Sequence, residues 1–339
     1  MDLKTAFALA KKHAGRTDGL QLATIGADFV ASRNDITGVR VAVETGLTGE
    51  PVRVDAVAAC KMIAKAGKDV VLTGGRQLTI TGTLGKFSLR ATRKNDWAVP
   101  KLPSRWRPVT EAAAQALRAV AELASPTKDD PLSTVRLSPY MSCSRTFSSL
   151  AVCYVQPTID AVTVPRTFLL KVAACRVGVL NNRLFLQTDK VVEWTRTLDA
   201  AYPDLSVYEA ITNRRDRAGE TFTVDIKALI PLVERAVLAC RVPADAGHLT
   251  LTAGQLAVSL SSDLGGYQGA VAVEGGTTEP KTLGIRPPQL LRFLKAIKAL
   301  QGDDHTRMHI AGDRDSLYLC TDTSTPVEAL IQPVFVPKT

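Results

Sequence analysis

The chain has 339 residues, 45% of them hydrophobic and 22% charged, which is the balance of a globular protein and excludes a disordered or fibrous one. No apolar run reaches the roughly 18 residues that a membrane helix needs. The first 15 residues are too interrupted by lysine for a signal peptide, and the six cysteines form no CxxC pair, so we expect a cytoplasmic protein without structural disulfides. A net charge of +9 favours a polyanionic partner.

The first 103 residues predict a helix, three strands and then a compact motif. The helix near the start carries Lys11 and Lys12 on or near one side, and turns follow at 26–28 and 34–35. Residues 51–82 (PVRVDAVAACKMIAKAGKDVVLTGGRQLTITG) predict strand, helix, strand, turn and strand. In that helix, Lys61, Lys65 and Lys68 have i, i+4 and i+7 spacing, which predicts one basic face.

Residues 104–213 predict a similar unit. Thr110 is expected to cap an alanine-rich helix, TEAAAQALRAVAELAS. Strand-like runs follow, among them AVTVP and RLFLQTD, and a Pro, Gly and charge-rich segment ends the unit.

Residues 214–339 predict a third unit. Asp225 is expected to cap a helix that reaches Ala239, with Pro231 bending or shortening its first turns. Strands are expected at HLTLTA, LAVSLSS and AVAVEG, and the Gly-rich stretch at 261–269 is expected to be a loop. The final run, PVEALIQPVFVPKT, predicts an edge strand with an ordered tail.

These three stretches align as one repeated α+β unit. Val54, Val164 and Ile285 take the same place, at offsets of about 110 and 121 residues, and a cation then falls at one helical position in each copy: Lys61, Lys171 and Arg292. A period near 110 residues is that of a domain rather than of a solenoid repeat. The alternative is that each cation is an ordinary solvated helix residue.

The motifs of common enzyme classes are absent from the sequence. It contains no GxxxxGK[ST] phosphate loop, no Gly-rich dinucleotide turn and no nucleophile motif. Only four histidines occur, so we expect neither a metal site nor a cofactor. We therefore expect a protein that is not an enzyme.

Three features together resemble the β sliding clamp of bacterial DNA polymerase III. The first unit resembles that family's first domain over NDITGVRVAVE and residues 51–91, and the second ends in YPDLSVY, similar to its Phe-Pro-Asp-Tyr junction. The third, with QLLRFLKAIKALQGDD and then ALIQPVFV, is similar to the last domain and its C-terminal Met-Pro-Met-Arg-Leu. The resemblance covers the whole chain.

The resemblance implies three clamp domains, 1–103, 104–213 and 214–339, each with two helices packed on β-sheets. Two chains would then close head to tail into a ring around duplex DNA and tether a DNA polymerase. Basic helices that line the hole would attract phosphates without reading bases. The DNA-facing residues expected on this basis are Lys11, Lys12, Lys61, Lys65, Lys68, Lys171, Arg292, Lys295 and Lys298.

The resemblance also implies a pocket between the second and third repeats for short peptide motifs of the polymerase and the clamp loader. Its expected wall consists of Leu150, Ile331, Pro333, Val334 and Val336. The alternative is that these residues only close the core of the third repeat.

The sequence departs from the family where that pocket is expected. The family's Thr-Asp-Gly-His-Arg-Leu turn reads Arg-Thr-Phe-Ser-Ser-Leu at 145–150, Phe335 stands in place of an arginine, and the chain is shorter than typical members. These departures indicate a divergent clamp, and they leave both a host origin and a phage or plasmid origin open. The rival hypothesis is a clamp-fold interaction protein that binds polymerase components without encircling DNA.

Overall fold

A computed structural model describes most of the chain, and its described residues form two compact units. Unit 1 comprises residues 1–108 and 174–197, and unit 2 comprises residues 109–173 and 198–339. The three-repeat division of the sequence stays a prediction. The described residues are 1–15, 21–92, 98–127, 130, 132–138, 142–146, 149–153, 159–199, 222–242, 245–262, 265–275, 279–301, 307–312, 317–321, 326–332 and 334.

Unit 1 is built on an antiparallel eight-stranded sheet with the order β4-β1-β2-β3-β15-β14-β13-β8. Strand β3 pairs with β15, so residues from the first and second sequence repeats share this sheet. Its strands are β1 (Leu22–Ile25), β2 (Phe29–Arg33), β3 (Thr37–Ala42), β4 (Val52–Asp55), β8 (Arg107–Val109), β13 (Cys175–Leu180), β14 (Arg183–Gln187) and β15 (Val191–Arg196).

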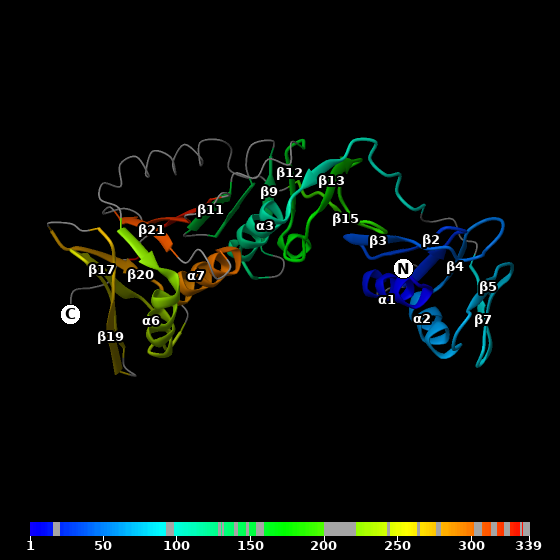
Figure 1. Cartoon of the computed structure of the whole chain (residues 1–339), viewed down its shortest axis with the longest axis horizontal. Coiled ribbons are helices and arrows are strands. Elements are labelled where there is room, and N and C mark those ends of the chain that lie inside the picture. Colours follow the sequence, from blue (N-terminus) through cyan, green and yellow to red (C-terminus); the bar gives the residue numbers. More distant parts are fainter. Residues whose placement is uncertain are drawn as a thin grey trace. The chain divides into compact units, whose positions relative to one another are not determined.

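Helices α1 (Leu3–His13) and α2 (Ala56–Lys65) pack side by side in unit 1 (Figure 1). Each begins at an aspartate, Asp2 or Asp55, whose carboxylate accepts a backbone N–H of the first turn. Apolar side chains such as those of Phe7 and Ile63 are fully buried in one hydrophobic core. A second sheet, β5 (Val71–Thr73), β6 (Gln77–Gly82) and β7 (Gly85–Arg90), completes the unit.

Unit 2 also has an eight-stranded sheet, with the order β12-β9-β10-β11-β23-β22-β21-β16. Its strands are β9 (Thr134–Leu137), β10 (Ser142–Arg145), β11 (Ser149–Cys153), β12 (Val162–Pro165), β16 (Phe222–Asp225), β21 (Arg307–Gly312), β22 (Leu317–Thr321) and β23 (Val327–Ile331). A four-stranded sheet holds β17 (Gly247–Thr252), β18 (Gln255–Ser262), β19 (Gly265–Ala272) and β20 (Lys281–Ile285), in the order β19-β18-β17-β20.

Helix α7 (Pro287–Gln301) packs between α3 (Glu111–Leu123) and α6 (Ile226–Leu238) in unit 2 (Figure 1). The predicted caps are confirmed: Thr110 Oγ1 accepts the N–H of Ala113 at 3.2 Å, and Asp225 accepts the N–H of Lys227 at 2.8 Å. Helix α6 starts directly after Asp225, so Pro231 does not shorten it. Helix α4 (Arg166–Leu169) is only one turn long.

Two sequence expectations in unit 2 are wrong. The last strand, β23, is not an edge strand, because it pairs with β11 on one side and β22 on the other. Pro326 and Pro333 lie outside its bounds, so no proline removes a ladder N–H. The expected Gly-rich loop at 261–269 lies largely in strands, since β18 reaches Ser262 and pairs there with Gly265, the first residue of β19.

Candidate functional site

The clearest basic surface lies on the two helices of unit 1. Lys11 and Lys12 lie in the last turn of α1, Lys61 and Lys65 lie one turn apart on α2, and all four are exposed. Neither helix contains an acidic residue. Among the residues that the structure describes, none of these lysines has an ion pair. Their charges are therefore available to a ligand in solution.

Lys68 does not lie on the same helix as Lys61 and Lys65, which corrects the expected i, i+4, i+7 face. Helix α2 ends at Lys65 because Gly67 adopts φ +91°, a left-handed conformation that stops a helix. The N–H of Lys68 instead donates to Thr83 Oγ1 at 3.0 Å, in the turn between β6 and β7. The side chain of Lys68 is exposed, so it can still contribute to the basic surface.

Lys171 is not a helical residue either. It lies in the turn after the one-turn helix α4, although it is exposed as expected. The reason is the spacing of the chain, because β13 begins at Cys175, nine residues after the start of α4. In the first repeat, fifteen residues separate the starts of α2 and β5. The second repeat therefore has six fewer residues for this helix and its connection to the next strand.

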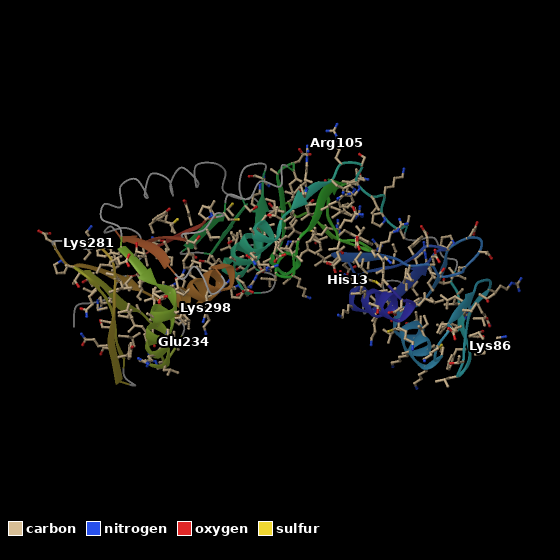
Figure 2. All side chains as sticks on the ribbon, in the orientation of Figure 1. His13, Lys86, Arg105, Glu234, Lys281 and Lys298 are labelled. Atoms are coloured by element: carbon tan, nitrogen blue, oxygen red, sulfur yellow. The ribbon has the colours of Figure 1, made fainter. Side chains whose placement is uncertain are left out.

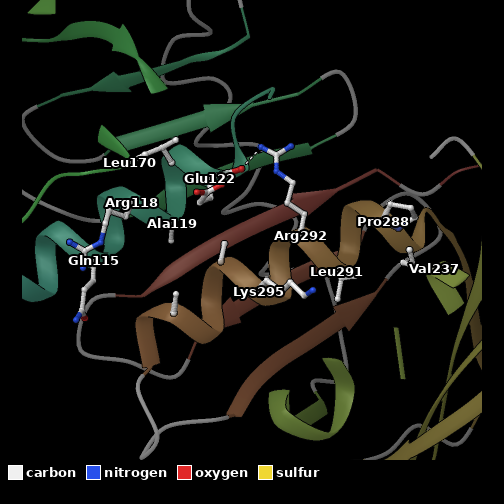
Figure 3. A pocket seen from close by; sticks show the side chains of 12 residues that line it. Gln115, Arg118, Ala119, Glu122, Leu170, Val237, Pro288, Leu291, Arg292 and Lys295 are labelled. Atoms are coloured by element: carbon white, nitrogen blue, oxygen red, sulfur yellow. Dashed lines mark hydrogen bonds between the residues drawn. The ribbon is translucent and has the colours of Figure 1, made fainter. Parts of the chain in front are cut away.

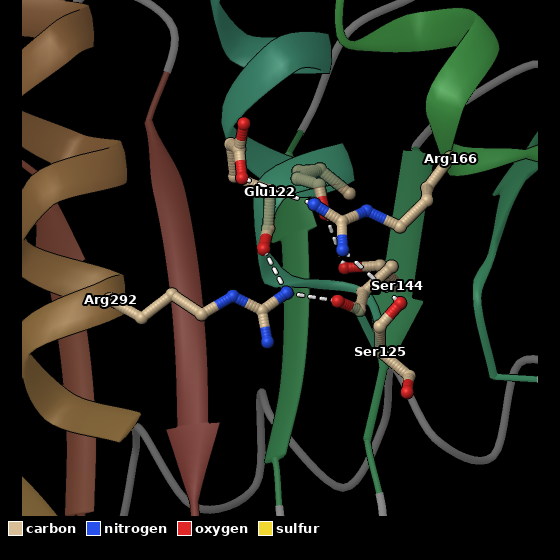
Figure 4. Close-up of polar contacts among 7 residues, drawn as sticks. Glu122, Ser125, Ser144, Arg166 and Arg292 are labelled. Carbon is tan, nitrogen blue, oxygen red and sulfur yellow. Dashed lines mark hydrogen bonds and ion pairs between the residues drawn. The ribbon is translucent and has the colours of Figure 1, made fainter. Parts of the chain in front are cut away.

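Arg292, the third of the aligned cations, is held by the end of another helix. Its guanidinium donates to the backbone oxygens of Glu122 and Ala124, where α3 ends (Figure 4). Burial, followed by the nearby charge of Arg166, lowers the pKa of Arg292. Helix α3 has no basic residue in its last turn, so Arg292 supplies the missing C-terminal cation. The expected helical position is thus shared by Lys61 and Arg292 but not by Lys171, and a DNA-facing role for the three stays a prediction.

A second arginine, missed in the sequence, stabilises the same helix end. Arg166 is 8% exposed and donates to the Ser125 carbonyl at 3.3 Å and to the Glu122 carboxylate at 3.2 Å (Figure 4). Ser144 Oγ adds a bond of 2.6 Å to the Val120 carbonyl. The only sequence signal was the lack of a glycine or cation at the end of α3. Which residues supply the bonds depends on the tertiary fold.

The remaining two candidate cations lie on α7. Lys295 Nζ lies 2.8 Å from Glu234 Oε1 on α6, so an acid already partners it. Lys298 is exposed one turn further along (Figure 2). On α3, Arg118 pairs with Glu111 at 2.9 Å and also donates to the Val172 carbonyl. The helices of unit 2 thus carry acids beside their cations.

Of the residues expected to form a peptide pocket, the structure describes the side chains of Ile331 and Val334. Ile331 is 5% exposed and pairs with Ser149, and it lines a cavity of only about 20 Å³ together with Leu123 and Phe293. The burial of Ile331 favours the alternative that it closes the core of the third repeat. The backbone of Leu150 pairs with Leu330 rather than with Ile331.

The C-terminal run is described only in part. The N–H of Val334 donates to the Gly284 carbonyl at 3.0 Å, which connects this run to β20. Pro333 and Val336 lie outside the described residues, as does the YPDLSVY segment. The turn before β11 is described at its ends, where the N–H of Thr146 donates to the Ser149 carbonyl at 2.8 Å.

The part of the chain that the structure describes offers no group of three or more His, Cys, Asp or Glu residues that could hold a metal ion. Within the same residues, no helix has both the length and the apolar character to cross a membrane. No disulfide joins the six cysteines, all of which the structure describes, and burial raises the pKa of Cys175 to about 11, with a smaller contribution from Glu193.

The fold defined by these sheets and helices is that of a DNA sliding clamp. Solved structures of this class match nearly the whole chain, and those named here are β subunits or sliding clamps of bacterial DNA polymerases. The DNA polymerase III β subunit from Pseudomonas aeruginosa has a TM-score of 0.79 at 17% identity, with 98% of both chains covered.

Two further structures show the same likeness. The sliding clamp from Bacillus subtilis has a TM-score of 0.80 at 15% identity, covering 99% of this chain and 97% of its own. The Helicobacter pylori β clamp, solved with a DNA ligase peptide, has a TM-score of 0.77 at 14% identity and coverages of 99% and 98%. No family model and no curated protein matches the sequence. At these identities the likeness establishes the fold.

Proposed function

We propose that this protein is a DNA sliding clamp, a replication processivity factor that encircles duplex DNA and tethers a DNA polymerase. The observation that carries the proposal is the exposed, unneutralised lysine face on α1 and α2, within a clamp fold that extends over nearly the full length of solved β clamps. Lysines without acidic neighbours bind phosphates through charge alone, and such binding does not depend on base sequence.

A ring of two chains also fits the sheet edges. Among the described residues, β7 forms one edge of the small sheet of unit 1, and β19 forms one edge of the four-stranded sheet of unit 2. An open edge is a template for pairing with another chain. Leu84, beside β7, is 77% exposed, and Leu238, at the end of α6, is 83% exposed. We infer a head-to-tail homodimer in which the first repeat of one chain contacts the third repeat of the other.

The proposal is tested by retention on DNA. A clamp assembled on nicked circular DNA should remain bound at a salt concentration that releases it from linear DNA of the same length, because only a closed circle prevents it from sliding off an end. Light scattering should give the mass of two chains at micromolar concentration. Equal loss from circular and linear DNA, or a monomer, would favour the rival interaction protein that does not encircle DNA.

We further propose that the junction of the second and third repeats binds peptide motifs of the polymerase and clamp loader. The support is the family resemblance together with the DNA ligase peptide of the Helicobacter pylori clamp. The cavity of about 20 Å³ beside Ile331 is small, and the expected wall also includes residues of the C-terminal run.

A truncation tests this second proposal. Deleting residues 332–339 should weaken binding of a polymerase tail peptide, measured by fluorescence anisotropy, because it removes Val334 and the end of the expected wall. The dimer should persist, since the deleted run contacts β20 and includes neither β7 nor β19. Unchanged peptide affinity in the truncated dimer would place the pocket elsewhere.

A further inference from the structure

A groove of about 580 Å³ runs between α3 and α7 in unit 2 (Figure 3). Small side chains create it: Ala119 on α3 and Ala296 on α7 are almost fully buried, and Ala299 lines the groove as an exposed residue. Larger residues at these positions would fill the space between the helices. The volume lies within the range of about 300 to 1,000 Å³ typical of sites for small organic ligands.

The walls of the groove are apolar. Leu170, Val237, Pro288 and Leu291 line it and are each only partly exposed. These side chains come from separate elements, since Leu170 follows α4, Val237 lies on α6, and Pro288 and Leu291 lie on α7. An apolar ligand body would remove their remaining surface from water, which is favourable in proportion to the area buried.

The side chains that line the groove include more cations than acids, although Arg118 and Lys295 each have an acidic partner outside the lining, Glu111 and Glu234. Three cations line it, Arg118, Arg292 and Lys295, against the single carboxylate of Glu122. That carboxylate already accepts a bond from Arg166, which does not line the groove. The lowered pKa of Arg292 has burial and the charge of Arg166 as its causes, so an added negative charge nearby would be stabilising.

We propose that this groove binds a small amphiphilic anion, with an aromatic or aliphatic body against the apolar walls and a carboxylate or sulfonate at the cationic side chains. Lys295 is the best placed to receive the anionic group. Its side chain is 55% exposed, and its present partner Glu234 is also solvent-accessible, so the ion pair can exchange at low cost.

The test uses anilinonaphthalene sulfonate, which joins an aromatic body to one sulfonate. Titration of the folded full-length protein should give saturable fluorescence with one site per chain and a dissociation constant on the order of tens of micromolar. Ala299→Trp should fill the groove and weaken binding at least tenfold. Ala64→Trp is the matched control, because Ala64 is an exposed helical alanine on α2 of unit 1 and should leave binding unchanged.

A second pair of variants tests the charge. Lys295→Met should weaken sulfonate binding severalfold but leave binding of the uncharged analogue N-phenylnaphthylamine unchanged. Lys298→Met is the control, since Lys298 is an exposed lysine three residues further along α7 that does not line the groove. Circular dichroism and thermal melts of each variant check that the fold is retained.

Each outcome decides one part of the proposal. No saturable binding to the wild type, or full affinity in Ala299→Trp, would overturn the site. Equal affinity for the sulfonate and the uncharged analogue, or no effect of Lys295→Met, would overturn the preference for an anion. Because the titration contains no DNA and no partner peptide, its result is independent of the clamp proposal.

Discussion

The helices of the two units use their positive charges differently. Helices α1 and α2 of unit 1 carry exposed lysines and no acid, whereas in unit 2 helix α3 carries Glu111 and Glu122 and helix α6 carries Glu234. Each of these three acids lies within ion-pair distance of a cation of unit 2: Arg118, Arg166 or Lys295. A count of basic residues on helices would treat the units as alike. The ion pairs of the cations in unit 2 predict a different role for each unit. The lysines of unit 1 bind DNA, whereas several cations of unit 2 stabilise the fold.

The largest effect should come from the lysines of unit 1. Changing Lys11, Lys61 and Lys65 together to Gln should lower the slope of log affinity against log salt for duplex DNA by about 0.9 per lysine, since each phosphate contact releases counterions. At about 0.1 M salt this corresponds to a loss on the order of 10²-fold. Fluorescence anisotropy with a short labelled duplex across a salt series measures both quantities.

The matched control is the triple change of Lys171, Lys295 and Lys298 to Gln in unit 2. It removes the same charge, but Lys295 is already paired with Glu234, so the slope should change less than in the unit 1 variant. An equal loss in the two triple variants would contradict the difference between the units.

A smaller effect, on stability, is expected at Arg292. Arg292→Met removes the donor to the carbonyls of Glu122 and Ala124, so both oxygens lose this hydrogen bond. We expect the free energy of unfolding to fall by roughly 1 to 3 kcal/mol. Lys61→Met, which removes an exposed charge in unit 1, should stay within about 0.5 kcal/mol. Urea denaturation of both variants makes the comparison, and equal stabilities would show that Arg292 is not a structural cap.

The smallest effect is a gain in DNA affinity. Glu234→Gln removes the acid that pairs with Lys295 and should raise duplex affinity severalfold at low salt, with a slope steeper by up to about 0.9. Glu50→Gln, which changes an exposed acid in unit 1 outside both helices, controls for the change in net charge. Equal gains in both variants would mean that net charge, rather than release of Lys295, sets the affinity.

Much of the fold follows from local sequence. Thr110 and Asp225 cap the helices they were expected to cap, and the alternation of apolar residues predicts most strands, because these signals act within a few residues. Gly67 is also a local signal, because a glycine often ends a helix in the left-handed conformation that it adopts here. That signal predicts a helix that ends before Lys68. The clamp fold itself was predicted from the order of weak motifs and is confirmed by structural likeness.

The site was harder to predict because its decisive contacts are distant in sequence. Arg292 bonds to carbonyls about 170 positions away, so its helical position alone could not show that it caps α3. The central place of β23 likewise depends on β11, which no local pattern near the C-terminus reveals. The DNA contacts and the peptide pocket remain predictions.

The pairing of β11 with β23 has a consequence for how the chain must be synthesised and handled. Strand β11 ends at Cys153, but its partner β23 ends at Ile331. One edge of β11 therefore stays unpaired until almost the whole chain has been synthesised. An edge exposed for that long is a site for aggregation. Expression of residues 104–213 alone should therefore yield an insoluble fragment. In the full chain, β23 pairs with that edge of β11.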